Sequence, residues 1–256
     1  MPYSLLLQCY IKNEVYPVTQ KHLHAMFLHI VNQVTPDLAT ILHQESKNKS
    51  FTLCLLEQKE NEIWWRLTLL DDCLFKPFSN ILFKTSEMEL YLGKNSILIA
   101  SILCSPLSGH PLANFTLYPQ IADSASKEIK TFKFCIMTPL AFKTGDGDLP
   151  LPVPKLFFTS LHKRWETYSD IKFNFDNFEP LIEQHVFISS FNLKSKEFFD
   201  GRAVSVGTVG DVTFNARGKI SPELIHYLNV LSDYAYYAGV GKKTTMGMGQ
   251  VKRIGK

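Results

Sequence analysis

The chain has 256 residues, of which 45% are hydrophobic, enough for one large core or for two domains of about 120 residues each. Its formal net charge of +3 is too small to indicate a class of partner. The charge is uneven, because residues 215–256 carry seven Lys or Arg against two acidic residues (+5), which leaves −2 for the rest. Such a basic segment is typical of a nucleic-acid-binding face, and a merely solvated basic end is the alternative.

The five cysteines are widely spaced in apolar runs: Cys9, Cys54, Cys73, Cys104 and Cys135. They form no C-x-x-C pair and no Cys/His cluster with metal-ligand spacing, so we expect small buried side chains in a reducing compartment. The N-terminus lacks a signal-peptide pattern, and no apolar stretch reaches about 18 residues. We therefore expect a cytoplasmic protein that has no membrane partner.

Hydrophobic periodicity predicts the order strand, helix, two strands, helix, strand in the N-terminal half. The predicted strands are 3–11, 50–56, 63–70, 89–92, 96–103 and 115–117, and the predicted helices are 20–34, 36–43 and 71–83. This is the order of a ferredoxin-like βαββαβ unit. At about 100° per residue, His22 and His29 lie on one flank of the first helix's apolar stripe and His24 on the other.

A polar linker at residues 122–127 precedes a second, looser series of the same kind. The predicted strands are 129–138, 185–193, 203–214 and 249–254, the predicted helices are 155–168 and 221–237, and residues 139–154 form a proline- and glycine-bearing loop. We therefore predict an α+β fold of two tandem ferredoxin-like domains, 1–121 and 128–256.

The glycine-rich segment 239–251 holds four of the chain's 13 glycines within eleven residues. Glycine at this density favours tight turns with positive φ, whose backbone amides, together with Lys242 and Lys243, can bind an anion such as phosphate. The segment is not a nucleotide-binding P-loop, because Met248 rather than a lysine follows Gly247, nor a dinucleotide fingerprint, because a strand rather than a helix follows it. A loop that only closes a sheet is the equally weighted alternative.

Four stretches carry a resemblance to a known family: residues 38–43 with 49–52, residues 134–142, residues 149–152 running into the helix at 155–165, and residues 239–251. They resemble the CRISPR-associated endoribonucleases of the RAMP superfamily, which cut repeat RNA to release guide RNAs. The resemblance implies a reaction without metal or cofactor. In it a ribose 2′-hydroxyl attacks the adjacent phosphate and leaves a 2′,3′-cyclic phosphate and a 5′-hydroxyl.

The resemblance also implies catalytic residues. His43 matches the family's histidine at the end of the second short helix, and Lys49 matches its lysine. A tyrosine or second histidine that members often carry on the first helix aligns with Leu28, so we predict the neighbouring His29, with His24 and then His22 behind it. Histidine can transfer protons near neutral pH, and lysine can stabilise developing negative charge. A partly buried surface histidine without function is the competing interpretation of each.

The predicted RNA contacts are Gly239, Gly241, Lys242, Lys243, Thr244, Gly247 and Gly249 of the glycine-rich segment, with Lys163 and Arg164 on the helix after the proline-bearing loop. The predicted partner is CRISPR repeat RNA, as precursor and as mature guide, with a CRISPR effector complex and a homodimer as open questions. A non-catalytic RNA-binding subunit of an effector complex is the alternative function. A metal-dependent enzyme is disfavoured, since no Asp/Glu/His cluster has ligand spacing.

Overall fold

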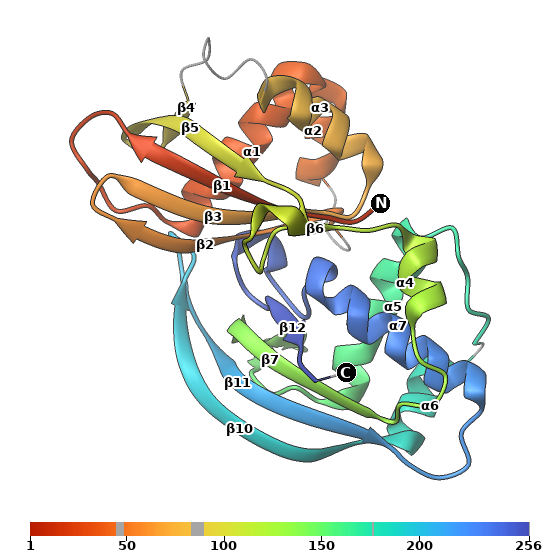
Figure 1. Cartoon of the computed structure of the whole chain (residues 1–256). Coiled ribbons are helices and arrows are strands. Elements are labelled where there is room, and N and C mark those ends of the chain that lie inside the picture. Colours follow the sequence, from red (N-terminus) through yellow and green to blue (C-terminus); the bar gives the residue numbers. More distant parts are fainter. Residues whose placement is uncertain (45–48, 83–89, 176, 256) are drawn as a thin grey trace. The chain divides into compact units, whose positions relative to one another are not determined.

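The computed structural model describes residues 1–44, 49–82, 90–175 and 177–255, which its contacts divide into two units (Figure 1). Unit 1 consists of Met1–Thr116, Phe199–Ala203 and Thr245–Gly247, and unit 2 consists of Leu117–Phe198, Val204–Thr244 and Met248–Lys256. The two short segments in unit 1 differ from the predicted domain ranges, which assign residues 199–203 and 245–247 to the C-terminal half.

In its described residues, unit 1 is a six-stranded antiparallel sheet with three α-helices and one short 3-10 helix, Pro106–Ser108. Its elements are β1 (Tyr3–Ile11), α1 (Gln20–Val34), α2 (Pro36–Gln44), β2 (Phe51–Lys59), β3 (Glu62–Leu69), α3 (Asp72–Leu82), β4 (Leu90–Leu92), β5 (Asn95–Leu103) and β6 (Asn114–Phe115). The strand order is β2-β3-β1-β5-β4, and β6 pairs with β1. The central strands are therefore β3 and β1, as expected for a βαββαβ unit with a further hairpin strand, β4.

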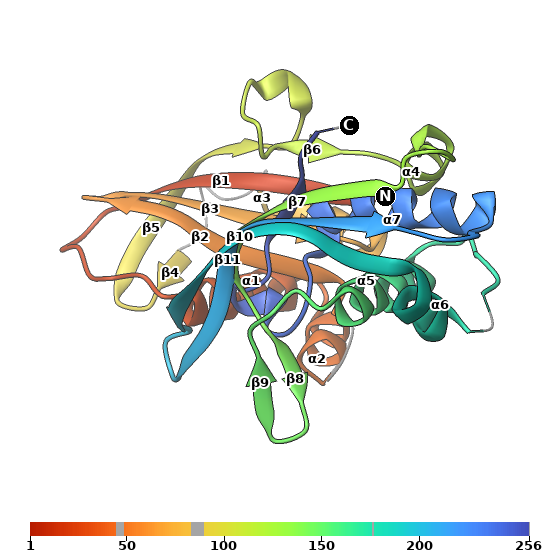
Figure 2. The ribbon, with the colours of Figure 1, turned by 90° about the horizontal axis from the view of Figure 1, so that it is seen from below.

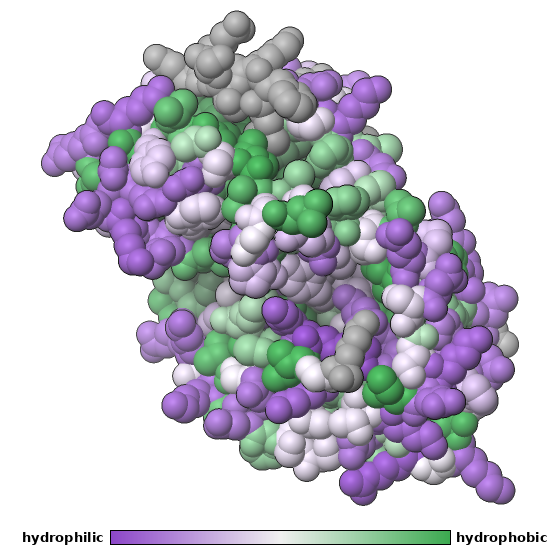
Figure 3. Space-filling model, in the orientation of Figure 1, coloured by the Kyte–Doolittle hydropathy of each residue, from purple (hydrophilic) through white to green (hydrophobic). Residues whose placement is uncertain are grey.

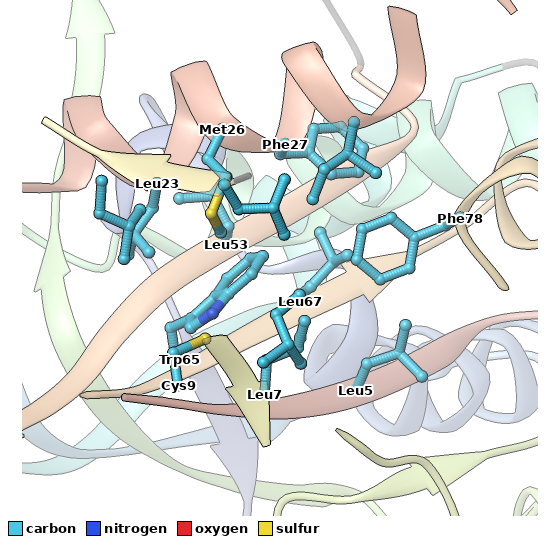
Figure 4. Packing of buried hydrophobic residues seen from close by; sticks show 14 of the residues in the cluster. Leu5, Leu7, Cys9, Leu23, Met26, Phe27, Leu53, Trp65, Leu67 and Phe78 are labelled. Atoms are coloured by element: carbon cyan, nitrogen blue, oxygen red, sulfur yellow. The ribbon is translucent and has the colours of Figure 1, made fainter. Parts of the chain in front are cut away.

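The core of unit 1 lies between its sheet and its helices. Alternate residues of β1 and β3, such as Leu7 and Trp65, point to the face on which α1 places Leu23, Met26 and Phe27, and all five are buried (Figure 4). This face uses the residues that period-2 and period-3.6 patterns predict. Packing against the sheet thus fixes which side chains of α1 remain outside the core.

Unit 2 repeats the same strand order. Its elements are α4 (Tyr118–Ser124), β7 (Thr131–Leu140), β8 (Phe142–Thr144), β9 (Gly147–Leu149), α5 (Pro154–Tyr168), α6 (Phe178–His185), β10 (Val186–Phe199), β11 (Val204–Ala216), α7 (Pro222–Ala238) and β12 (Val251–Arg253). The main sheet has the order β10-β11-β7-β12, which matches β2-β3-β1-β5 of unit 1 position by position. The predicted tandem ferredoxin-like fold is confirmed.

An aromatic cluster forms much of the core of unit 2. Phe132 and Phe134 of β7 and Phe214 of β11 meet Phe157 and Phe158 of α5, with ring centroids between 4.8 and 6.5 Å apart. Helix α7 begins where predicted, because the Ser221 hydroxyl accepts a hydrogen bond from the amide of Leu224 at 3.2 Å.

Two predictions of local structure are wrong. Residues 118–124 form α4, so the linker predicted at 122–127 begins inside a helix. The loop predicted at 139–154 contains the hairpin β8–β9, which forms a separate two-stranded sheet (Figure 2). The strand predicted at 185–193 is present as β10 and begins one residue later, because His185 ends α6.

The prediction that the cysteines are buried holds for only part of the set, because Cys9 and Cys54 are buried whereas Cys73 and Cys104 are exposed and Cys135 is half-buried.

On the face shown in Figure 3, hydrophilic residues dominate the periphery and apolar residues form scattered patches among them. None of the helices in the described part of the chain has the length and apolar composition needed to cross a membrane.

Candidate functional site

The first turn of α1 already uses one of the candidate histidines. Thr19 precedes the helix in an extended conformation (φ −114°, ψ 163°), and its amide donates a hydrogen bond to Nδ1 of His22 at 3.3 Å. Burial, followed by the charge of Lys21, lowers the pKa of His22, which keeps the acceptor nitrogen unprotonated. His22 therefore serves the helix start, as a cap does.

His24 faces the glycine-rich segment within unit 1. Its Nδ1 lies 3.0 Å from the carbonyl oxygen of Thr245, and its ring stacks on Phe51 with centroids 5.7 Å apart and planes 29° apart. A carbonyl oxygen only accepts hydrogen bonds, so Nδ1 carries the hydrogen and Nε2 is the acceptor nitrogen in the neutral ring. This contact orients the half-buried ring and fixes its tautomer.

His29 lies further along α1 in a different environment. It is exposed, and its Nε2 is 3.4 Å from the side-chain nitrogen of Gln33, one turn later on the same helix. This position matches the solvent side of the border predicted from the helical periodicity. The contact is local, so it does little to hold the ring in one orientation.

Of the other two predicted catalytic residues, His43 lies at the end of α2 and Lys49 lies between α2 and β2. His43 belongs to the last turn of α2, and its side chain lies outside the described part of the structure. The ammonium of Lys49 donates a hydrogen bond to the carbonyl oxygen of Leu42, the residue before His43. A cation at a helix C-terminus is stabilised by the helix dipole. The charge of Lys49 is thus held at the helix end that bears His43.

The backbone of the glycine-rich segment explains its glycines. Gly239, Gly241, Gly247 and Gly249 all have φ between +64° and +97°, a region that favours glycine. A Cβ on Gly241 would collide with the carbonyl oxygen of Ala141, and one on Gly249 with that of Val240. Close packing of backbone on backbone therefore accounts for at least two of the four.

The amides of this segment are largely engaged within the protein. Those of Val240, Lys242 and Gly249 donate to the carbonyl oxygens of Gly249, Ala141 and Pro139 at 2.8 to 2.9 Å. The amide of Gly241 donates to the Ser160 hydroxyl at 3.2 Å. The amides of Val240, Gly241, Lys242 and Gly249 are therefore used within the protein, and the binding of an anion by the rest of this segment stays a prediction.

The two lysines of the segment converge on one serine. The ammonium groups of Lys242 and Lys243 each lie 3.4 Å from the hydroxyl of Ser205, and that of Lys242 also pairs with Asp148 of β9. Lys243 is one of two non-glycine residues with positive φ (52°) among those described. Sequence reasoning missed Asp148 and Ser205, because no spacing pattern links residues separated by 94 and 37 positions.

Arg164 and Lys163, predicted as neighbouring phosphate contacts, have opposite environments. Arg164 is buried, and its guanidinium donates to the carbonyl oxygen of Ala238 and, at 2.6 Å, to the hydroxyl of Thr244. It ties α5 to both ends of the turn at residues 238–244 and presents no open face to RNA. Lys163 is exposed, with its ammonium 3.5 Å from Glu179 of α6.

Models of known protein families match most of the chain. A family model described as the CRISPR Cas6 N-terminal domain matches residues 1–62 and 56–123, and one described as CRISPR-associated endoribonuclease Cas6 matches residues 134–251. A curated CRISPR-associated endoribonuclease Cas6 of Streptococcus thermophilus is 26% identical over 87% of each chain. One of Mycobacterium tuberculosis is 24% identical over 90% of this chain and 70% of its own.

Solved structures of the same name have the same fold. A Cas6 product complex is 30% identical over 99% of each chain, with a TM-score of 0.90. A Thermus thermophilus Cas6 is 30% identical over 99% of this chain and 98% of its own, with a TM-score of 0.78. A Cas6 substrate mimic complex, 21% identical over 99% of each chain with a TM-score of 0.78, agrees in fold.

Proposed function

Since the chain belongs to the Cas6 family of CRISPR-associated endoribonucleases, we propose that it cuts repeat RNA without a metal ion, through side chains of α1 and α2. The family gives the enzyme class, an endoribonuclease that processes CRISPR repeat RNA. Complexes of similar proteins with a product and with a substrate mimic support repeat RNA as its partner. The guide RNA produced passes, in this proposal, to a CRISPR effector complex.

The proposed reaction is an intramolecular transesterification. A base removes the proton of the ribose 2′-hydroxyl, the 2′-oxygen forms a bond to the adjacent phosphorus, and the bond to the 5′-oxygen breaks. An acid gives a proton to that 5′-oxygen. The products are a 2′,3′-cyclic phosphate and a 5′-hydroxyl, and two proton transfers and one cation are needed.

His43 and His24 are the proposed proton-transfer pair. The observation that carries this assignment is the 3.0 Å contact between Nδ1 of His24 and the carbonyl oxygen of Thr245, which leaves Nε2 as the reactive nitrogen of an oriented ring. The exposed His29, predicted from sequence, has only a 3.4 Å contact with its own helix. Geometry thus favours His24, the residue ranked second.

Lys49 is the proposed source of positive charge for the phosphorane. Its ammonium at the C-terminal end of α2 supports this role, because it donates to the carbonyl oxygen of Leu42, the residue before His43. Lys242 and Lys243 of unit 2 are proposed to bind the RNA backbone through their side chains, with Lys163 as a further phosphate contact. Gly239, Gly241, Thr244, Gly247, Gly249 and Arg164 would then shape and hold the segment that carries these lysines.

Replacement of His43 tests the proposal directly. His43→Ala should abolish cleavage of cognate repeat RNA in EDTA. The dissociation constant for that RNA should stay within about threefold of the value for the unaltered protein, because the imidazole stabilises the transition state by proton transfer and contributes little to binding of the substrate. Full cleavage by the variant would discard the assignment. Tight binding without cleavage by the unaltered protein would instead favour the non-catalytic subunit.

A further inference from the structure

The first two turns of α1 contact residues 245–247, which belong to the same unit, at two points. Gln20 and His24 are four residues apart, so their side chains lie on the same face of the helix. His24 meets the carbonyl oxygen of Thr245 through Nδ1 at 3.0 Å. Gln20 packs against Gly247, since a Cβ on that glycine would lie 2.5 Å from Cδ and 2.6 Å from Oε1 of the glutamine. Helix α1 therefore contacts both ends of this three-residue segment.

The side chain of Gln20 is itself held by the sheet of unit 1. Its Oε1 accepts a hydrogen bond from the amide of Leu55 at 2.9 Å. Leu55 belongs to β2, which lies at one end of the strand order in that sheet. A glutamine bonded to β2 cannot turn away from Gly247 without leaving this amide without its acceptor, which costs free energy. The contact between Gln20 and Gly247 is therefore constrained from both sides.

Thr245 and Gly247 lie in one tight turn, which a hydrogen bond from the amide of Met248 to the carbonyl oxygen of Lys243 closes at 3.2 Å. Gly247 is buried and has φ +97°, a conformation that favours glycine. A larger residue at this position is thus disfavoured twice, by the backbone conformation and by the side chain of Gln20. In so short a turn, a shift of Gly247 also moves the carbonyl oxygen of Thr245.

We propose that Gln20 is a positioning residue for RNA cleavage, because it holds the turn that fixes the tautomer of His24. By packing on Gly247 while bonded to Leu55, it keeps the carbonyl oxygen of Thr245 against the Nδ1–H group of His24. Nε2 then remains the nitrogen that exchanges a proton with the RNA. Without this support either ring nitrogen can carry the hydrogen. The inference rests on the proposed function, in which His24 transfers a proton, and Gln20 acts only through that ring.

Nitrogen-15 NMR of the histidine rings tests the proposal on the full-length protein without RNA. At pH about 8.5, above the ordinary histidine pKa of about 6.5, His24 should carry its hydrogen on Nδ1 alone in the unaltered protein and on either nitrogen in Gln20→Ala. Loss of signals in His24→Gln identifies the ring. Single-turnover cleavage by Gln20→Ala should be about 10- to 100-fold slower, because a misplaced catalytic group lowers the rate, with RNA affinity unchanged within about threefold.

Two further variants separate positioning of the ring from a general effect on folding. Gln20→Glu keeps the shape of the side chain and an oxygen that can accept from Leu55, so it should retain the single tautomer. Gln33→Ala makes the same truncation as Gln20→Ala at an exposed position of the same helix, and it should change neither the tautomer nor the cleavage rate. Near-ultraviolet circular dichroism verifies that each variant is folded.

A single Nδ1–H tautomer in Gln20→Ala, or the same mixture of tautomers in Gln20→Glu as in Gln20→Ala, would overturn the proposal. A mixture in Gln20→Ala together with full cleavage would support the positioning of the ring and contradict the assignment of His24 to proton transfer. The NMR measurement needs neither RNA nor cleavage. Failure of this inference is therefore distinguishable from failure of the proposed endoribonuclease mechanism.

Discussion

The proposed role of His24 rests on a contact between residues that are far apart in the chain. Thr245, whose carbonyl oxygen it meets, is 221 positions away in the sequence. A proton-transferring imidazole is more effective when its second nitrogen is held, because the tautomer and the ring orientation are then fixed before substrate binds. At the scale of single residues, this distinguishes His24 from the other histidines of α1.

Paired substitutions on α1 measure that distinction. His24→Ala should lower the single-turnover cleavage rate by about 10²- to 10⁴-fold, the range typical of a lost general acid or base, with RNA affinity little changed. His29→Ala, an equal truncation on the same helix, should lower the rate by less than about threefold. If His29→Ala were the inactive variant, the original sequence-based choice would be right and the geometric argument would fail.

Adjacent residues of α5 provide a second matched pair. Arg164→Met should destabilise the protein by about 3 kcal/mol, because it leaves the buried carbonyl oxygen of Ala238 and the hydroxyl of Thr244 without their donors. Lys163→Met, at an exposed site, should change stability by less than about 0.5 kcal/mol. Urea unfolding of both variants decides the matter, and equal midpoints would contradict the structural role of Arg164.

Sequence reasoning located the candidate histidines and lysines, but its ranking of the α1 histidines differs from the one that the contacts favour. His43 and Lys49 are close in the chain, and a resemblance over a short stretch brings both to notice. The preference for His24 over His29 depends on Thr245, and the engagement of Lys242 depends on Asp148. Neither partner is near in sequence, so a ranking that placed His29 first, from its position beside Leu28, could not take these contacts into account.

Among the elements, the glycine-rich turn combines tight backbone packing with two lysines. Its glycines let the chain approach the backbones of Ala141 and Val240, where a Cβ would collide. Arg164 holds the same turn from α5. The closely packed backbone of the turn thus positions its two charged side chains, Lys242 and Lys243.

Binding of repeat RNA at several salt concentrations tests this view of the turn. Lys243→Ala should weaken binding and reduce the slope of log affinity against log salt by about 1, as expected for one lost phosphate contact. Asp148→Asn should strengthen binding, because it removes the carboxylate that competes for Lys242. An unchanged salt slope in Lys243→Ala, together with unchanged affinity in Asp148→Asn, would restrict both lysines to a structural role.

Whole elements were predicted best where a long apolar pattern exists. Strand β1 and helices α1, α5 and α7 have strong periodicity and clear starts, and their observed bounds agree with prediction within about two residues. The hairpin β8–β9 has strands of three residues in a segment rich in proline and glycine, too short to give an alternating pattern. Helix α6 has only eight residues, about two turns, which is too short to give a clear helical periodicity.

At the scale of the whole molecule, stability should depend on pH through the half-buried His162. Nδ1 of His162 lies 2.7 Å from the Tyr227 hydroxyl, and its ring stacks on Phe178 with centroids 4.4 Å apart. Burial lowers the pKa of His162, the carboxylates of Glu166 and Glu179 oppose this effect, and the charge of Lys163 adds to it. Below the ordinary histidine pKa of about 6.5 the unfolded chain therefore binds more protons than the folded one, and acid destabilises the fold.

Thermal melts between pH 7.5 and 5 should show this loss. The melting temperature should fall as the pH drops below about 6.5, and His162→Gln, which keeps a polar partner for Tyr227, should fall less steeply over the same range. His226→Gln is the control, because the His226 ring also lies near Tyr227: its centroid is 5.7 Å from that of Phe173, which stacks on Tyr227. Parallel curves for the unaltered protein and His162→Gln would show that other groups govern acid stability.

The central claim is that the chain cuts RNA by internal attack of a 2′-hydroxyl. The most direct measurement is cleavage, in EDTA, of cognate repeat RNA and of the same RNA with a single 2′-deoxy nucleotide at the cut site. The account predicts that the first yields a 2′,3′-cyclic phosphate and a 5′-hydroxyl, and that the second binds equally well and remains whole. Cleavage of the deoxy substrate at the same bond, or products that end in a 3′-hydroxyl and a 5′-phosphate, would contradict it.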